Sequence, residues 1–164
     1  MTNKQKERGK YFETKTANCI RNCFGLKEYE CRRAPNSGNG EFEFGDIFFT
    51  DPVKYPLVIE CKWGYDWDFT TLFPETNKLV LNFLEKVYIA RNKYINKFAT
   101  APYATGVVMA KPHWPCIFVT TSFYDGLAII KPKTDFVFEN VSMPIYIYSF
   151  ENVLSLWKKV LLNE

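Results

Sequence analysis

Histidine is almost absent from this sequence, and its cysteines are not arranged as ligand pairs. The 164 residues contain one histidine, His113, and five cysteines without a Cys-x-x-Cys pair. A metal site built from several histidines, a two-histidine nuclease and a phosphohistidine relay are therefore nearly excluded. Cys19 and Cys23 are spaced to share one helix face. A structural zinc site needs four ligands, so we expect these thiols to pack in the core of a reduced, cytoplasmic protein. Catalysis must then use carboxylates and lysine.

Long apolar runs are also missing. No uncharged apolar stretch approaches the roughly 18 to 20 residues that cross a bilayer, and none follows the charged residues 1–10. We therefore expect neither a membrane span nor a secretory signal. The composition, 47% apolar and 24% charged, is typical of a folded protein. Because the chain lacks internal repeats and linkers, residues 1–164 are expected to form a single domain.

The hydrophobic periodicity predicts an α/β fold. Apolar side chains recur every three or four positions along residues 5–24, 76–98 and 150–162, which predicts three amphipathic helices. Strands are predicted at residues 28–33, 42–49, 57–62, 106–110, 116–120, 127–130, 136–138 and 145–148. We expect strands 42–49 and 57–62 to pair as a hairpin, and the turn formers of residues 34–40 to make a loop. This order of elements predicts a mixed central sheet flanked by helices.

Two charged residues interrupt the apolar strand at 57–62. Because side chains alternate along a strand, Glu60 and Lys62 are expected on one face and Cys61 on the other. Asp46, on the preceding strand, follows a glycine that allows a close backbone approach. Two carboxylates and one lysine can thus converge, and hard oxygen ligands of this kind suit Mg²⁺. The set fits metal-assisted hydrolysis of a phosphodiester, with the lysine polarising or helping to deprotonate the attacking water.

A solvated strand face is the simpler interpretation of the same pattern. A Glu-x-Lys pair on a strand usually contributes only a small charge interaction. Here, however, the strand is expected in the interior of the sheet, where burying two opposite charges without a function is costly. The preceding Gly45-Asp46 pair, the loop before it and a carboxylate in the first helix favour a functional site.

Four segments of the chain form a recognisable set: Arg8-Gly9-Lys10-Tyr11-Phe12-Glu13, a basic strand leading into Ser37-Gly38, Gly45-Asp46-Ile47, and Ile59-Glu60-Cys61-Lys62. Together they resemble the PD-(D/E)XK nuclease superfamily. Their spacing is most similar to the archaeal-type Holliday junction resolvases and related small phage nucleases. The resemblance covers the motif core 6–63 and agrees in pattern over the sheet continuation 106–120. Gly-Asp replaces Pro-Asp, and residues 121–164 have no assigned role.

The resemblance implies a restriction-endonuclease-like fold and a role for each motif residue. Asp46 and Glu60 would bind the metal together with the backbone carbonyl of Cys61, and Lys62 would orient the nucleophilic water. Glu13 would face the site from the first helix and hold a metal-bound water or a second ion. The alternative for Glu13 is an exposed carboxylate that pairs weakly with a neighbouring lysine.

Basic residues near the motif are candidates for DNA contacts, although each could be an ordinary solvated side chain. They are Arg8, Lys10, Arg32 and Arg33. Phosphate contacts of this kind give an affinity that falls steeply with salt. The resemblance also implies that Ser37 approaches the scissile phosphate. Any loop with a Ser-Gly pair would give the same correspondence.

Aromatic residues alternate directly after the motif. Trp63, Tyr65, Trp67 and Phe69 could stack on unpaired bases, but packing in a core or a dimer interface is the favoured interpretation. His113 lies among prolines and is predicted to be a structural turn residue.

These observations predict a Mg²⁺-dependent DNA endonuclease, with Mn²⁺ able to substitute, that cuts four-way junctions or other branched DNA in recombination, repair or replication. A sequence-specific restriction or homing-type endonuclease and a non-catalytic DNA-binding module on the same fold remain alternatives. Resolvases act on two opposed strands, so a homodimer is expected. Neither a membrane partner nor a small-molecule cofactor is expected.

The net charge of +3 conceals an uneven distribution. Residues 1–40 hold nine basic and four acidic side chains. Residues 41–75 hold two basic and eight acidic side chains, and residues 76–97 hold five basic and one acidic side chain. The remaining residues are balanced, five against five. An acidic centre suited to a cation thus lies between two basic segments suited to phosphate backbones.

Overall fold

The computed structural model describes residues 3–35, 44–65, 78–121, 136–138 and 145–163. Their elements, in chain order, are α1 (Asn3–Phe24), β1 (Cys31–Arg33), β2 (Ile47–Phe49), β3 (Leu57–Trp63), α2 (Lys78–Phe98), β4 (Ala104–Ala110), β5 (Ile117–Thr120), β6 (Phe136–Phe138), β7 (Ile145–Ser149) and α3 (Phe150–Leu161). The three predicted helices are confirmed to within two residues at their ends. The predicted strand 127–130, Ser37, Trp67 and Phe69 lie outside the described residues.

The main sheet is mixed, as predicted. Its five strands follow the order β3-β4-β5-β7-β6. β3 and β4 run parallel, joined by the crossover through α2, and the other neighbours are antiparallel. β1 and β2 form a separate two-stranded antiparallel sheet. The α/β fold with a mixed sheet flanked by helices is therefore confirmed.

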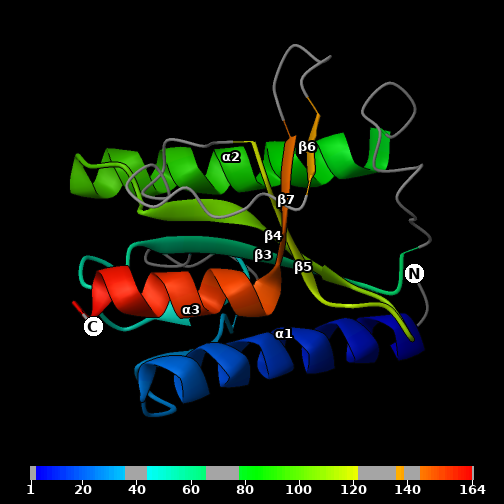
Figure 1. Cartoon of the computed structure of the whole chain (residues 1–164), viewed down its shortest axis with the longest axis horizontal. Helices are drawn as coiled ribbons and strands as arrows, with labels where there is room; N and C mark the ends of the chain where they lie inside the picture. Colours follow the sequence, from blue (N-terminus) through cyan, green and yellow to red (C-terminus); the bar gives the residue numbers. More distant parts are fainter. Residues whose placement is uncertain (1–2, 36–43, 66–77, 122–135, 139–144, 164) are drawn as a thin grey trace.

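Helices cover both faces of the main sheet (Figure 1). α1 and α3 lie on one face and α2 lies on the other. Neighbouring residues on the central strands divide between these two sides: Val108 and Phe118 are buried in the core with Phe12 of α1, whereas Val107 packs with Phe83 of α2. We call these the α1 core and the α2 core. Burial on both faces explains why β4 and β5 are almost continuously apolar.

The predicted hairpin between strands 42–49 and 57–62 is wrong. β2 pairs with β1, where Arg33 lies opposite Ile47, and the bridge between Gly45 and Ile59 is parallel. A hairpin requires antiparallel strands. Ile47 and Phe49 are buried in the α1 core, so β2 packs there with β1 instead of extending the main sheet.

Two smaller predictions concern His113 and the thiols. His113 is exposed, has a φ of 65° and lies in the turn between β4 and β5, as predicted. All five cysteines are free, and Cys31 and Cys61 are buried. Burial raises the pKa of the Cys31 thiol to about 12.

None of the helices in the described ranges combines the length and hydrophobicity needed to cross a bilayer.

Candidate active site

β3 carries the centre of the site. Ile59 and Cys61 are buried in the α1 core, whereas the Lys62 ammonium lies 5.5 Å from the centroid of the Phe83 ring on α2. The predicted alternation, with Glu60 and Lys62 opposite Cys61, therefore holds. Among the described strands, β3 lies at the edge of the main sheet, so the expected interior position is wrong. Its free edge is instead covered by the segment that contains Asp46.

Gly45 brings that segment against β3. Its φ of 96° is accessible mainly to glycine, and a Cβ at this position would clash with the Ile59 carbonyl oxygen. The Asp46 backbone N–H donates to that same oxygen at 2.8 Å. The Asp46 carboxylate, in turn, accepts a hydrogen bond from the Cys61 backbone N–H at 2.8 Å. The glycine thus positions a buried carboxylate on the edge of β3.

Lys62 joins the two carboxylates. Its Nζ lies 2.7 Å from Glu60 Oε2 and 3.7 Å from Asp46 Oδ2. It also donates a hydrogen bond to the Cys61 carbonyl oxygen at 3.2 Å. The side chains of all three charged residues are at most 14% exposed. The simple solvated strand face is therefore wrong for this pair.

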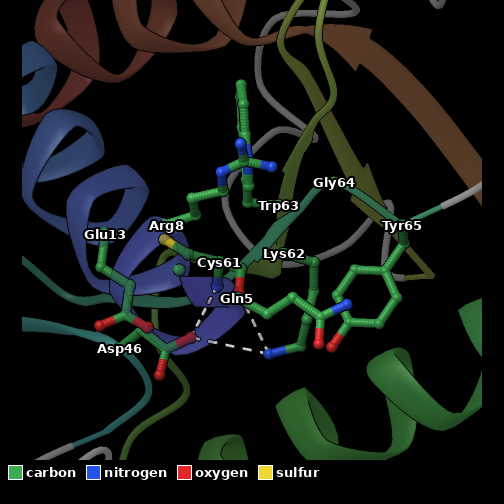
Figure 2. Close-up of a pocket in the computed structure, with 10 residues that line it drawn as sticks. Gln5, Arg8, Glu13, Asp46, Cys61, Lys62, Trp63, Gly64 and Tyr65 are labelled. Atoms are coloured by element: carbon green, nitrogen blue, oxygen red, sulfur yellow. Dashed lines mark hydrogen bonds and ion pairs between the residues drawn. The ribbon is translucent and has the colours of Figure 1, made fainter. Parts of the chain in front are cut away.

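Glu13 reaches the same region from α1, and its carboxylate lies beside that of Asp46 (Figure 2). Its partner is Arg33 of β1, whose Nε lies 2.6 Å from Glu13 Oε2. The Glu13 side chain is 16% exposed. The alternative of an exposed carboxylate paired with a lysine is therefore wrong.

The crowding of carboxylates changes the protonation equilibria. Burial and the neighbouring charge of Asp46 raise the pKa of both Glu13 and Glu60, against the opposing effects of Arg33 and Lys62. Burial alone would lower the pKa of Lys62, but the charges of Glu60 and Asp46 outweigh it and raise that pKa. Lys62 therefore stays charged. For Glu13 and Glu60, the nearby positive charges offset only part of the rise in pKa.

The donor set fits a hard divalent cation. No described group of three or more His, Cys, Asp and Glu side chains forms a ready metal cluster. Asp46, Glu60 and the Cys61 carbonyl oxygen nevertheless converge on one point, the Lys62 ammonium. Mg²⁺ takes one or two protein carboxylates and completes its octahedron with water and phosphate. A cation here would also compensate the carboxylate repulsion that raises the pKa of Glu60.

A pocket of about 500 Å³ opens above these groups. Its lining comes from α1, from the Asp46 segment and from the end of β3, and consists of Gln5, Arg8, Gly9, Glu13, Asp46, Cys61, Lys62, Trp63, Gly64 and Tyr65. Sequence reasoning missed Gln5, Gly9 and Gly64 as site residues. The available signal was helical spacing, because Gln5, Gly9 and Glu13 repeat every four residues on one face of α1.

The basic candidates have different surroundings. Arg8 lies at the pocket, and Lys10 is exposed on α1. Arg32 is exposed, and its guanidinium lies 5.1 Å from the Phe48 ring centroid. Arg33 is turned towards Glu13 instead. Of the four, Arg33 is thus paired with a carboxylate of the site, and Arg8 lines the pocket.

A mixed sheet whose edge strand presents Glu60 and Lys62 beside Asp46 is the arrangement of the PD-(D/E)XK nuclease superfamily. Residues 4–102, more than half of the chain, match the family model described as "Phage putative PDDEXK endonuclease", and the chain belongs to this family. Comparisons with curated proteins and with solved structures found no significant match. The family makes the chain a nuclease of this superfamily with DNA as its substrate, and such nucleases generally depend on a divalent metal.

Proposed function

We propose that this protein is a Mg²⁺-dependent DNA endonuclease, able to use Mn²⁺, that hydrolyses phosphodiesters in four-way junctions or other branched DNA. The convergence of Asp46, Glu60 and Lys62 at one end of β3 carries the proposal. Asp46 and Glu60 would hold the ion together with the Cys61 carbonyl. When bound, the ion would neutralise the charge that develops on the phosphate and acidify an attacking water.

Each protein group then has a separate task. Lys62 has three donor hydrogens, two of which are used by Glu60 and the Cys61 carbonyl, so the third can orient the attacking water. Glu13 can accept a hydrogen bond from a second water on the α1 side of the pocket. Arg8 can contact a flanking phosphate, and exposed Lys10 and Arg32 can extend that contact along the DNA backbone. Ser37 would approach the scissile phosphate.

The preference for branched DNA and a homodimeric state rest on the resemblance of residues 6–63 to the resolvases. Two copies related by a twofold axis would present two sites to two opposed strands. Sedimentation of the protein alone and with a junction tests this part, and a monomer in both samples would contradict it.

Cleavage tests the chemistry directly. We expect the wild type to cut a four-way junction faster than a linear duplex built from the same arms in Mg²⁺ or Mn²⁺, and to cut neither in EDTA. Lys62→Ala should lower the rate by about 100-fold or more, since it removes the group that positions the water. Lys54→Ala, at an exposed lysine that precedes β3, is the matched control and should keep the wild-type rate.

Other outcomes identify the alternatives. Cleavage of linear duplex at one fixed sequence would replace junction resolution by a restriction or homing-type activity. Absence of cleavage together with absence of Mg²⁺ binding in calorimetry would make the protein a non-catalytic DNA-binding module. Full activity of Lys62→Ala would contradict the assigned site.

A further inference from the structure

Two aromatic rings stand on opposite sides of the end of β3. In a regular strand, residues two apart point to the same face. Trp63 packs with the α1 core, its ring centroid 5.3 Å from that of Phe12, whereas Tyr65 packs with the α2 core, 4.9 Å from Phe83. β3 ends at Trp63, and Gly64, with a φ of 72°, turns the chain between the two rings. The turn at this glycine therefore sends the two rings to different faces.

Both residues belong to the pocket at the candidate site. They line it and are half-buried. A Cβ added to Gly64 would meet nothing within 4 Å among the described residues, which leave space beside this glycine. Figure 2 shows Trp63 and Tyr65 on either side of Gly64, with Lys62 between Tyr65 and the Asp46 carboxylate. The two aromatic residues thus share one cavity with Glu13, Asp46 and Lys62.

The cavity has the size and chemistry of a ligand site. Its volume of about 500 Å³ falls within the range of about 300–1,000 Å³ that is typical of small-ligand pockets. Each ring is supported by a core ring, which holds it in a defined orientation. Gln5 and Arg8 of α1 add an amide and a guanidinium to the lining. This combination of flat apolar walls with a few polar groups suits a heteroaromatic ring attached to a phosphate.

Within a paired duplex, a base lies inside the helix and cannot enter such a pocket while its phosphate is at the active site. An unpaired nucleotide has no such restriction, and bases stack readily on aromatic side chains. Relying on the proposed nuclease function for the position of the phosphate, we propose that the pocket lined by Trp63 and Tyr65 binds an unpaired nucleobase next to the scissile phosphate. Tyr65 and Trp63 are specificity-determining residues, and the preferred substrates contain an unpaired nucleotide at the cut site.

The test compares two duplexes that differ by one base. Each carries a single-nucleotide bulge, and in one of them the bulged nucleotide is abasic, so that the backbone is interrupted equally in both. The wild type should cleave the base-containing bulge about tenfold faster than the abasic bulge. Tyr65→Leu should bring this ratio close to one, and Tyr65→Phe, which keeps the ring, should retain it. Tyr88→Leu, at a 54% exposed tyrosine of α2 outside the pocket, is the control and should retain both rate and ratio.

A wild-type ratio of one, or an unchanged ratio in Tyr65→Leu, would overturn the base pocket while leaving the nuclease intact. If no substrate is cut, the proposed nuclease function is wrong. A binding measurement then tests the base pocket. Fluorescence anisotropy in EDTA should then show about tenfold tighter binding of the base-containing bulge by the wild type and by Tyr65→Phe, but not by Tyr65→Leu. Equal affinity of the wild type for both bulges would overturn the pocket there as well.

Discussion

Arg33 Nε lies 2.6 Å from Glu13 Oε2, so the end of β1 is tied to the middle of α1 at the wall of the pocket. The guanidinium is 24% exposed and the carboxylate 16% exposed, which shields the pair partly from water. An arginine in this position offsets part of the effect of burial and of Asp46, which together raise the pKa of Glu13. It also holds Glu13 beside Asp46, the neighbour whose charge raises the pKa of Glu13.

A double-mutant cycle should detect this pair. Glu13→Gln, Arg33→Gln and the double variant are expected to give a coupling free energy of about 1–3 kcal/mol in urea unfolding, because the partners are close and half-buried. The same cycle with Arg32, which is exposed beside Arg33, should give a coupling near zero. Additive effects of Glu13→Gln and Arg33→Gln would mean that the ion pair contributes nothing to stability.

Arg33 also illustrates which parts of the site sequence reasoning can reach. Helix periodicity and strand alternation are local, so α1 and the shared face of Glu60 and Lys62 were predictable. The partner of Arg33 depends on how β1 packs on α1, which no local pattern specifies. The same limitation explains the wrong hairpin, because β2 pairs with β1, and the position of β1 depends on its packing on α1.

The raised pKa of Glu60 predicts a pH dependence in the absence of metal. Unfolded glutamates titrate near pH 4.3, whereas burial and Asp46 raise the pKa of Glu60 in the fold, so the folded state binds more protons above that pH. Protonated Glu60 therefore contributes its full stabilisation of the wild type below about pH 4.3. This contribution decreases as the pH rises through the raised pKa of Glu60. In EDTA, Glu60→Gln should gain stability relative to the wild type between pH 4.5 and 8. Glu85→Gln, exposed on α2, should show no such trend, and a constant difference for Glu60→Gln would refute the prediction.

Metal binding should make the wild type more stable than Glu60→Gln, the reverse of the order expected in EDTA. A cation that binds only the folded protein stabilises it by about 2.7 kcal/mol at a concentration 100 times its Kd. We expect Mg²⁺ to raise the unfolding temperature of the wild type and to have little effect on Asp46→Asn or Glu60→Gln, which lose a proposed ligand. Glu28→Gln, at an exposed glutamate, should respond like the wild type. Equal stabilisation of all four proteins would place the metal elsewhere.

Gly45→Ala should damage both the fold and the site. The φ of 96° and the clash with the Ile59 carbonyl each disfavour a side chain, so we expect a loss of at least about 2 kcal/mol in the free energy of unfolding. Because the Asp46 backbone N–H bonds to that carbonyl, the carboxylate should also move, and cleavage should fall further than the stability loss explains. Gly9→Ala is the stability control: its Cβ would meet nothing within 4 Å on α1, and better helix propensity should add up to about 1 kcal/mol. Urea unfolding measures the difference in stability between the two variants. A Gly45→Ala protein as stable as the wild type would contradict the prediction, because it would show that a side chain is tolerated at this strand edge.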